Sequence, residues 1–129
     1  VGSEMCIRDR HYGALGLYAE SIKYIKKAMK LGRNDSWINV EYGACLAGLD
    51  KYEEAIEKLL EARRLYMAEG KAPYSEDLEL AYCYAALGDK NKAKYHMDSS
   101  IEALGAYAES EEYLKKRFTE IKEMINSLK

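Results

Sequence analysis

Small and large apolar residues recur along the chain with helical spacing, in three segments that resemble one another. In each segment a small residue is followed four positions later by a large apolar residue and, three positions after that, by a second small residue. The three sets are Ser21, Ile25 and Ala28; Ala55, Leu59 and Ala62; and Ala93, Met97 and Ser100. These steps place each set on one face of a helix, where small side chains let a second helix approach closely. The pattern therefore predicts three packed helices.

A partner helix precedes each of these segments and carries a small residue of its own. The small residues of the partner helices are Gly13, Gly43 and Ala81. Turn-forming residues separate the two helices of each pair, at 15–16, 48–50 and 87–89. The chain is thus predicted to consist of consecutive helix pairs.

The distance between equivalent positions gives the length of the repeat. Ser21, Ala55 and Ala93 are equivalent, and the second step is longer than the first by four positions. This difference amounts to about one helical turn. We place the additional turn at 65–75, where Gly70 is expected to end a helix and Ser75 to begin the next, ahead of two acidic residues.

The last part of the chain has a different pattern. One apolar stripe is formed by Leu114, Phe118, Ile121, Ile125 and Leu128. Ser110 and the two glutamates after it are typical of a helix start. A repeat array has to end in a helix with a polar outer face, so the stripe predicts a capping helix. A coiled-coil partner helix is the alternative, but two heptads fall short of the three to four such a helix needs.

Composition restricts the classes of protein. The chain has 129 residues, of which 33% are charged and 48% hydrophobic, with a formal net charge of −2. This length suits one domain, and no apolar run is long enough to cross a bilayer. Positive and negative residues are interspersed, so no basic surface for nucleic acid or an anionic membrane is indicated. We expect neither kind of partner.

The middle pair resembles the tetratricopeptide repeat, in a divergent bacterial form. The agreement spans 37–46 and 50–56, with the sequences WINVEYGACL and DKYEEAI. Trp37 is shifted by two positions from the family pattern, and the proline that ends a family repeat is absent. The resemblance implies an all-α solenoid of helix-turn-helix repeats. Its units are a partial repeat at 11–35, repeats at 36–73 and 74–106, and a capping helix at 107–129.

The first ten residues, with the sequence VGSEMCIRDR, do not continue this pattern. They resemble the in-frame translation of a transposon-end sequencing adapter of the kind that remains in untrimmed metagenomic or draft reads. We therefore treat 1–10 as a non-native segment and expect the natural N-terminus to lie further upstream.

The sequence offers no constellation for catalysis, a metal or a cofactor. Neither His11 nor His96 has an acidic residue or cysteine at the spacing of a known metal motif. We expect His96 to be a partly solvated residue at the rim of its helix. No enzyme activity is predicted.

Cys45 and Cys83 share one register, each two residues after the small residue of its helix. A disulfide is one interpretation of this register. Helices of neighbouring repeats are ~8–10 Å apart, which exceeds the reach of an unstrained disulfide, so we expect two buried thiols instead. Buried thiols favour a reducing compartment and hence a cytoplasmic protein.

The family resemblance implies a concave groove that binds a peptide or a partner helix. Its predicted lining, carried over by register, is Trp37, Val40, Glu41, Ala44, Leu78, Glu79 and Tyr82. The alternative is that Trp37 packs against the first pair and Tyr82 covers the seam between helices. The two glutamates favour a partner with Lys or Arg beside an apolar anchor. Some members of the family bind the C-terminal carboxylate of a partner with Lys and Asn side chains in the groove. The corresponding positions here are apolar or aromatic, so a clamp of this kind is not expected.

The predicted function is that of a non-catalytic scaffold or adaptor for a protein or peptide partner. This prediction combines the family resemblance with the lack of a catalytic constellation. The alternative is the C-terminal sensory or oligomerisation part of a larger regulator or enzyme whose effector domain lies upstream.

Overall fold

The computed structural model of the chain describes residues 15–70 and 75–128, including all side chains in these ranges except those of 15, 16, 75 and 104–110. The described residues form six α-helices and contain no strand, so the predicted all-α fold class is confirmed. The helices are α2 (Leu15–Lys30), α3 (Ser36–Gly48), α4 (Tyr52–Ala68), α5 (Ser75–Ala86), α6 (Lys90–Ser110) and α7 (Glu112–Asn126).

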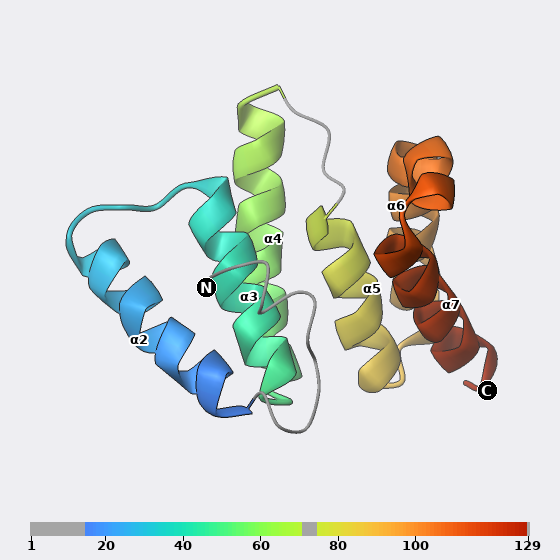
Figure 1. The fold of residues 1–129 in the computed structure, drawn as a ribbon, viewed down its shortest axis with the longest axis horizontal. Helices are drawn as coiled ribbons and strands as arrows, with labels where there is room; N and C mark the ends of the chain where they lie inside the picture. Colours follow the sequence, from blue (N-terminus) through green and yellow to red (C-terminus); the bar gives the residue numbers. More distant parts are fainter. Residues whose placement is uncertain (1–14, 71–74, 129) are drawn as a thin grey trace.

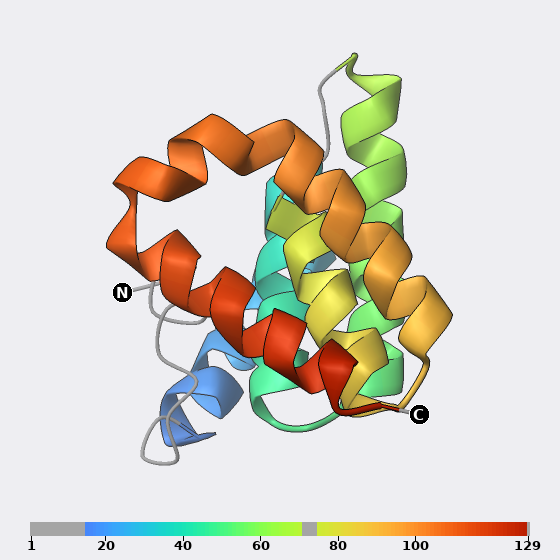
Figure 2. The same ribbon diagram turned by 90° about the vertical axis from the view of Figure 1, so that its right-hand side faces the viewer.

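The helices stand side by side in a row (Figure 1). Helix α2 packs against α3, α3 against α4, and α4 against α5. At the other end, α7 packs against both α5 and α6. The view turned by 90° shows α6 running away from its start near the C-terminus and α7 returning across α5 (Figure 2). The strong contacts thus join helices that are first or second neighbours along the chain.

The small–large–small sets lie where helices meet. All six members of the second and third sets are buried, facing α3 and α5 respectively. In the first set Ile25 is buried, but Ser21 and Ala28 are only half-buried. The predicted contact faces are therefore confirmed on α4 and α6, and the corresponding face of α2 is less fully covered.

Close approach of α3 and α4 explains the glycine in their interface. A Cβ atom added to Gly43 would lie 2.5 Å from Cγ of Leu59 and 3.2 Å from the backbone oxygen of Ala55. Real Cβ atoms are not found at the first of these distances, so a side chain at this position would force the helices apart.

The core is divided among the helix interfaces. One cluster lies between α2 and α3 around Tyr18 and Ile25, a second joins α3, α4 and α5 around Leu59, and a third joins α5, α6 and α7 around Met97 and Ile121. A small fourth cluster at one end of α3 and α4 contains Val40. Each interface thus has its own apolar core.

Most of the predicted turns are found. Helix α3 ends at Gly48 and is followed by Asp50 with a positive φ of 62°, and α4 ends just before Gly70, whose φ is 76°. Gly88, with a φ of 84°, separates α5 from α6. Positive φ favours glycine, or else Asp and Asn, so these residues suit the turns.

Two boundaries differ from the prediction. The turn expected at 15–16 is wrong, because both residues belong to the first turn of α2; a glycine costs little there, where few intrahelical hydrogen bonds exist. The boundary expected between 106 and 107 falls inside α6, and the chain breaks instead at Glu111, where the Ser-Glu-Glu sequence predicted a helix start. The segment 1–10, His11 and Gly13 lie outside the described residues.

Candidate functional site

Several residues of the predicted groove are in the interior. Val40, Ala44 and Leu78 are at most 3% exposed. Val40 packs with Ala62 and Tyr66 of α4, and Ala44 belongs to the core between α2 and α3. These three side chains do not line an open surface, because the helix face that the register assigned to a groove is covered by neighbouring helices.

Helix α7 covers the part of the predicted groove that lies on α5. Arg117 Nη2 donates a hydrogen bond to Glu79 Oε2 at 3.1 Å, and its guanidinium lies 5.0 Å from the ring centre of Tyr82. Leu78 shares a core with Phe118 and Ile121. The two glutamates were expected to attract a basic group beside an apolar anchor from a partner. For Glu79, the chain itself supplies that group.

The half-exposed Tyr82 also packs edge-on against Tyr52 of α4, with 6.1 Å between the ring centres. Tyr82 therefore lies where α4 and α5 meet, the position that the alternative interpretation gave it. Of the four predicted residues on α3, only Trp37 and Glu41 remain accessible.

Trp37 and Glu41 share one face of α3, four residues apart. The indole of Trp37 is 45% exposed and Glu41 is half-buried. The start of α3 is fixed by Asp35, whose Oδ1 accepts a hydrogen bond of 2.8 Å from the backbone N–H of Ile38. Such a cap holds the first turn in place, and with it the tryptophan. The accessible remainder of the predicted groove on α3 is therefore an aromatic side chain beside a carboxylate.

A second polar cluster surrounds Asp77 of α5, in the interior. Its Oδ1 accepts a hydrogen bond of 3.0 Å from Arg63 Nε and lies 2.8 Å from His96 Nδ1, and its Oδ2 accepts one of 2.7 Å from Ser99 Oγ. Burial by itself raises the pKa of Asp77, but the hydrogen bonds from His96 and Ser99 and the charge of Arg63 outweigh it and lower that pKa. Asp77 thus joins α4, α5 and α6.

The position of His96 differs from the prediction. Its ring is buried, stacked on Tyr84 at 5.5 Å and in edge contact with Tyr95 at 5.0 Å. The expectation of a partly solvated histidine is wrong, because α5 covers this side of α6. The hydroxyl of Ser99 bonds to the carboxylate and not to the ring, so the group lacks the serine–histidine contact of a nucleophilic site.

Glu76 and Asp77 were missed as interior residues because they stand in the first turn of α5, where acidic residues are usually exposed. Glu76 and Asp77 have no exposed surface. The available signal was periodicity: Asp77 is four residues before Ala81 and eight before Ala85, which places it on their buried face.

The cysteines are not alike. Cys45 is disulfide-bonded, whereas Cys83 is a buried thiol outside any disulfide. The two residues are therefore not bonded to each other. The expectation of two buried thiols is wrong for Cys45, and the argument for a reducing compartment falls with it, because that argument required both cysteines to be thiols.

Among the residues described, no three His, Cys, Asp or Glu side chains are grouped so that they could hold a metal ion. None of the described helices combines the length and apolar character needed to cross a membrane.

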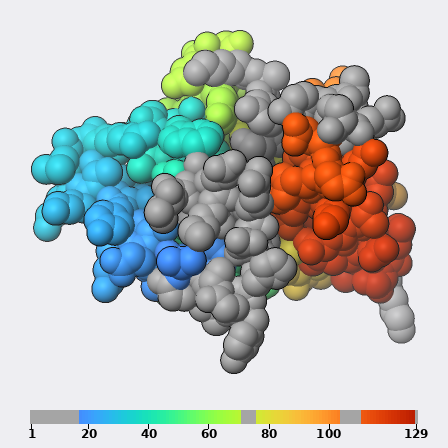
Figure 3. Space-filling model, in the orientation of Figure 1, coloured from blue at the N-terminus to red at the C-terminus, as the bar shows by residue number. Residues whose placement is uncertain are grey.

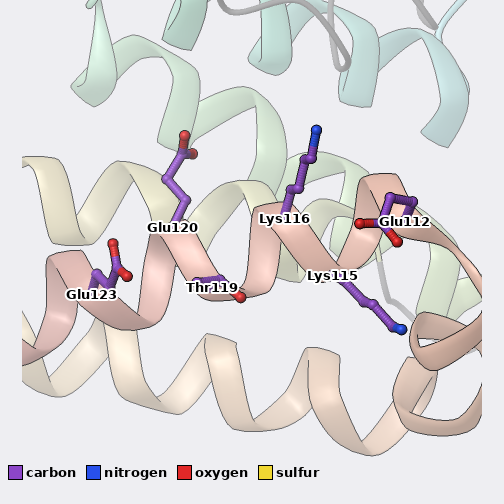
Figure 4. Close-up of a pocket in the computed structure, with 6 residues that line it drawn as sticks. All are labelled: Glu112, Lys115, Lys116, Thr119, Glu120 and Glu123. Atoms are coloured by element: carbon purple, nitrogen blue, oxygen red, sulfur yellow. The ribbon is translucent and has the colours of Figure 1, made fainter.

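A shallow depression of about 470 Å³ lies on the outer face of α7. Figure 4 shows its lining residues, which all come from this one helix. They are Glu112, Lys115, Lys116, Thr119, Glu120 and Glu123. Ligand sites are usually concave and mostly apolar, whereas this surface is open and bears mixed charges. We interpret it as the solvated side of an amphipathic helix.

The chain matches no known protein-family profile, and neither a curated protein nor a solved structure is significantly similar to it.

Proposed function

We propose that the chain is a non-catalytic protein-interaction module built of helical repeats similar to the tetratricopeptide repeat, with α7 as its capping helix. The consecutive helix pairs and the recurring small–large–small faces support this proposal. The buried polar side chains of the protein also favour binding over catalysis, because Asp77 and Glu79 are engaged in ion pairs between helices.

The observation that carries the proposal is the exposed Trp37 beside Glu41. Tryptophan is among the side chains that contribute most to binding energy when a partner covers them. Glu79 is equivalent to Glu41 in the next repeat, and it binds Arg117, which is followed directly by Phe118. By analogy, the partner of Trp37 and Glu41 is a peptide or helix in which Arg or Lys stands beside a large apolar residue.

The experiment is a selection from a displayed library of random 16-residue peptides against the immobilised full chain. We expect enrichment of peptides with a basic residue next to an aromatic or large aliphatic one. The selected peptides should bind the Trp37→Ala and Glu41→Lys variants at least tenfold more weakly.

Leu60→Ala is the matched control, because Leu60 of α4 is 43% exposed, much like Trp37, and does not belong to the predicted groove. It should leave peptide binding unchanged. If no peptide is enriched, or if the enriched peptides bind Trp37→Ala as well as the wild type, the proposed function is wrong.

A further inference from the structure

Lys94 and Tyr95 of α6 form an exposed surface of one basic and one aromatic residue (the Tyr95 surface). Tyr95 is 60% exposed, and Lys94 is exposed as well. None of the ion pairs between described residues involves Lys94. This composition is the one that the proposed function assigns to a ligand of Trp37 and Glu41 (the Trp37 surface), namely a basic residue beside a large apolar one.

The fold already contains one contact of this kind. Arg117 and Phe118 are also consecutive residues of a helix, and they bind Glu79 and pack with Leu78, respectively. Glu41 is the repeat equivalent of Glu79. Two consecutive helical residues can thus supply a positive charge to one of these glutamates and an apolar side chain to its surroundings.

Tyr95 points away from the core but is held in place. Its ring meets that of the buried His96 edge-on, with 5.0 Å between the ring centres, and His96 Nδ1 lies 2.8 Å from Oδ1 of Asp77. The repeat-equivalent residues, Lys23 and Glu57, are exposed too, so this side of the three helices faces outward. A side chain that is exposed and already positioned loses little conformational freedom when a partner covers it.

The charges of the two surfaces are complementary. Glu41 is the only charged residue of α3, and no ion pair between described residues involves it. Helix α6 carries three lysines before its first acidic residue, which is Asp98. Opposite charges favour the encounter of two surfaces and fix their register. The basic start of α6 therefore matches the carboxylate beside Trp37.

The two surfaces belong to different parts of the row of helices. Figure 1 shows α5 between α3 and α6, and α3 and α6 are not in strong contact. The space-filling view has the first helices, in blue and cyan, at one edge of the molecule and the last ones, in orange and red, at the other (Figure 3). A contact between the two surfaces therefore joins two copies of the chain.

Tyr24 of α2 also follows a lysine and is 68% exposed, but it lies on another side of its helix. The equivalent residue of α4 is Lys58, whose Nζ lies 5.1 Å from the ring centre of Tyr42 on α3. The equivalent residue of α6 is His96, which stacks on Tyr84 of α5. This side of the helices thus serves contacts within one copy, which makes Tyr24 a matched control for Tyr95.

We propose that the Tyr95 surface of one copy binds the Trp37 surface of a second copy, so that copies of the chain assemble head to tail. This inference rests on the proposed function, because it assigns the partner of the Trp37 surface. The two surfaces differ, so the contact is heterologous, and every copy that is added leaves one surface of each kind free. The assembly therefore grows with concentration and does not stop at a dimer.

The test is sedimentation velocity of the full chain at concentrations up to about 1 mM, because a contact made by few side chains is weak. We expect the average sedimentation coefficient to rise with concentration. Trp37→Ala and Tyr95→Ser each remove one surface, so each variant alone should self-associate at least tenfold more weakly. Tyr24→Ser, the matched control, should assemble as the wild type does. Circular dichroism establishes that the variants keep their helix content.

A mixture of the two variants tests the head-to-tail arrangement. Trp37→Ala keeps an intact Tyr95 surface, and Tyr95→Ser keeps an intact Trp37 surface, so one intact contact can form between them. The mixture should therefore give a dimer and no larger species. Exchange of charge is a second test: Glu41→Lys and Lys94→Glu should each weaken self-association, and the double variant should restore most of it.

Other results would overturn the inference. Assembly that Tyr95→Ser retains, or that Tyr24→Ser abolishes, would show that the Tyr95 surface is not the partner. A mixture of the two variants that stays monomeric would contradict the head-to-tail contact. A wild-type chain that binds the selected peptides through Trp37 and yet stays monomeric would refute the second copy as partner and leave the proposed function standing. Failure of the proposed function appears instead as a selection without enriched peptides.

Discussion

Glu79 of α5 and Arg117 of α7 form an ion pair of 3.1 Å in which the side chains are only 1% and 6% exposed. A second nitrogen of the guanidinium donates a hydrogen bond of 2.7 Å to Glu120 on the outer side of α7. A buried charge is tolerated only with such partners, so the pair fixes how α7 lies on α5.

Removing the guanidinium should destabilise the protein strongly. We expect Arg117→Ala to lower the free energy of unfolding by about 3–5 kcal/mol, because a buried carboxylate loses its counter-charge. The double variant Glu79→Leu, Arg117→Met should recover most of this loss, since it replaces both charges by apolar groups. Urea denaturation of the three proteins measures the difference.

The exposed pair of Arg64 with Glu61 is the control for this prediction. Arg64→Ala should leave the urea midpoint unchanged, because exposed ion pairs contribute little. A loss in Arg117→Ala no larger than that in Arg64→Ala would contradict the role assigned to Arg117.

Asp77 should make stability depend on pH on the acid side. Its pKa in the folded protein is lower than the ordinary value of 3.8, so the folded state favours the ionised carboxylate. The stabilising contribution is fully present above the ordinary pKa, and it is lost as the pH falls through the lower pKa of the folded state. In Asp77→Asn this contribution is missing at every pH.

The measurement is urea denaturation of wild type and Asp77→Asn between about pH 6 and pH 3. The wild type should be more stable at the upper end, and the difference should shrink toward the lower end. Asp98→Asn, at an exposed position of α6, serves as the control. A difference between wild type and Asp77→Asn that stays constant over this range would refute the linkage.

Gly43→Ala should lower stability although alanine favours helices. The added Cβ would lie 2.5 Å from Cγ of the buried Leu59, and overpacking of this kind costs about 1–3 kcal/mol. Thermal unfolding followed by circular dichroism measures it. Leu59→Ala opens the space that the added Cβ needs. The loss of stability in the double variant should therefore be smaller than the sum of the two single losses. Additive losses would argue that α3 and α4 do not meet at this point.

Deleting 111–129 should cause aggregation. Helix α7 covers Leu78 and Met97, and a repeat array without its last helix exposes such a surface. Light scattering and size-exclusion chromatography report the outcome. Thr119→Ala, on the outer face of α7, is the control and should remain monomeric to the same extent as the wild type. A truncated chain that behaves like the wild type would show that α7 is dispensable.

The helical part of the fold could be predicted because its signals are local. The spacing of Ala55, Leu59 and Ala62 depends only on helix geometry and side-chain size, and those residues are buried as expected. The turn at Gly88 follows in the same way from the positive φ that a tight turn requires.

The interior charges could not be predicted, because their partners come from distant parts of the chain. Asp77 binds His96, 19 residues later, and Glu79 binds Arg117, 38 residues later. A carboxylate in the first turns of a helix is usually exposed, and only the position of the neighbouring helices reverses this. The predicted groove failed at Leu78 for the same reason, since the register identified the face but not that α7 would cover it.

The arrangement of the helices in a row, each in strong contact only with near neighbours along the chain, has a kinetic consequence. Chains rich in such short-range contacts close small loops first and fold fast. Their units also open in part, as in other linear arrays, so loss of structure can start at one end while the other end stays intact. Helix α2, which is in strong contact with α3 alone, is where amide hydrogen exchange should be most rapid among the described helices.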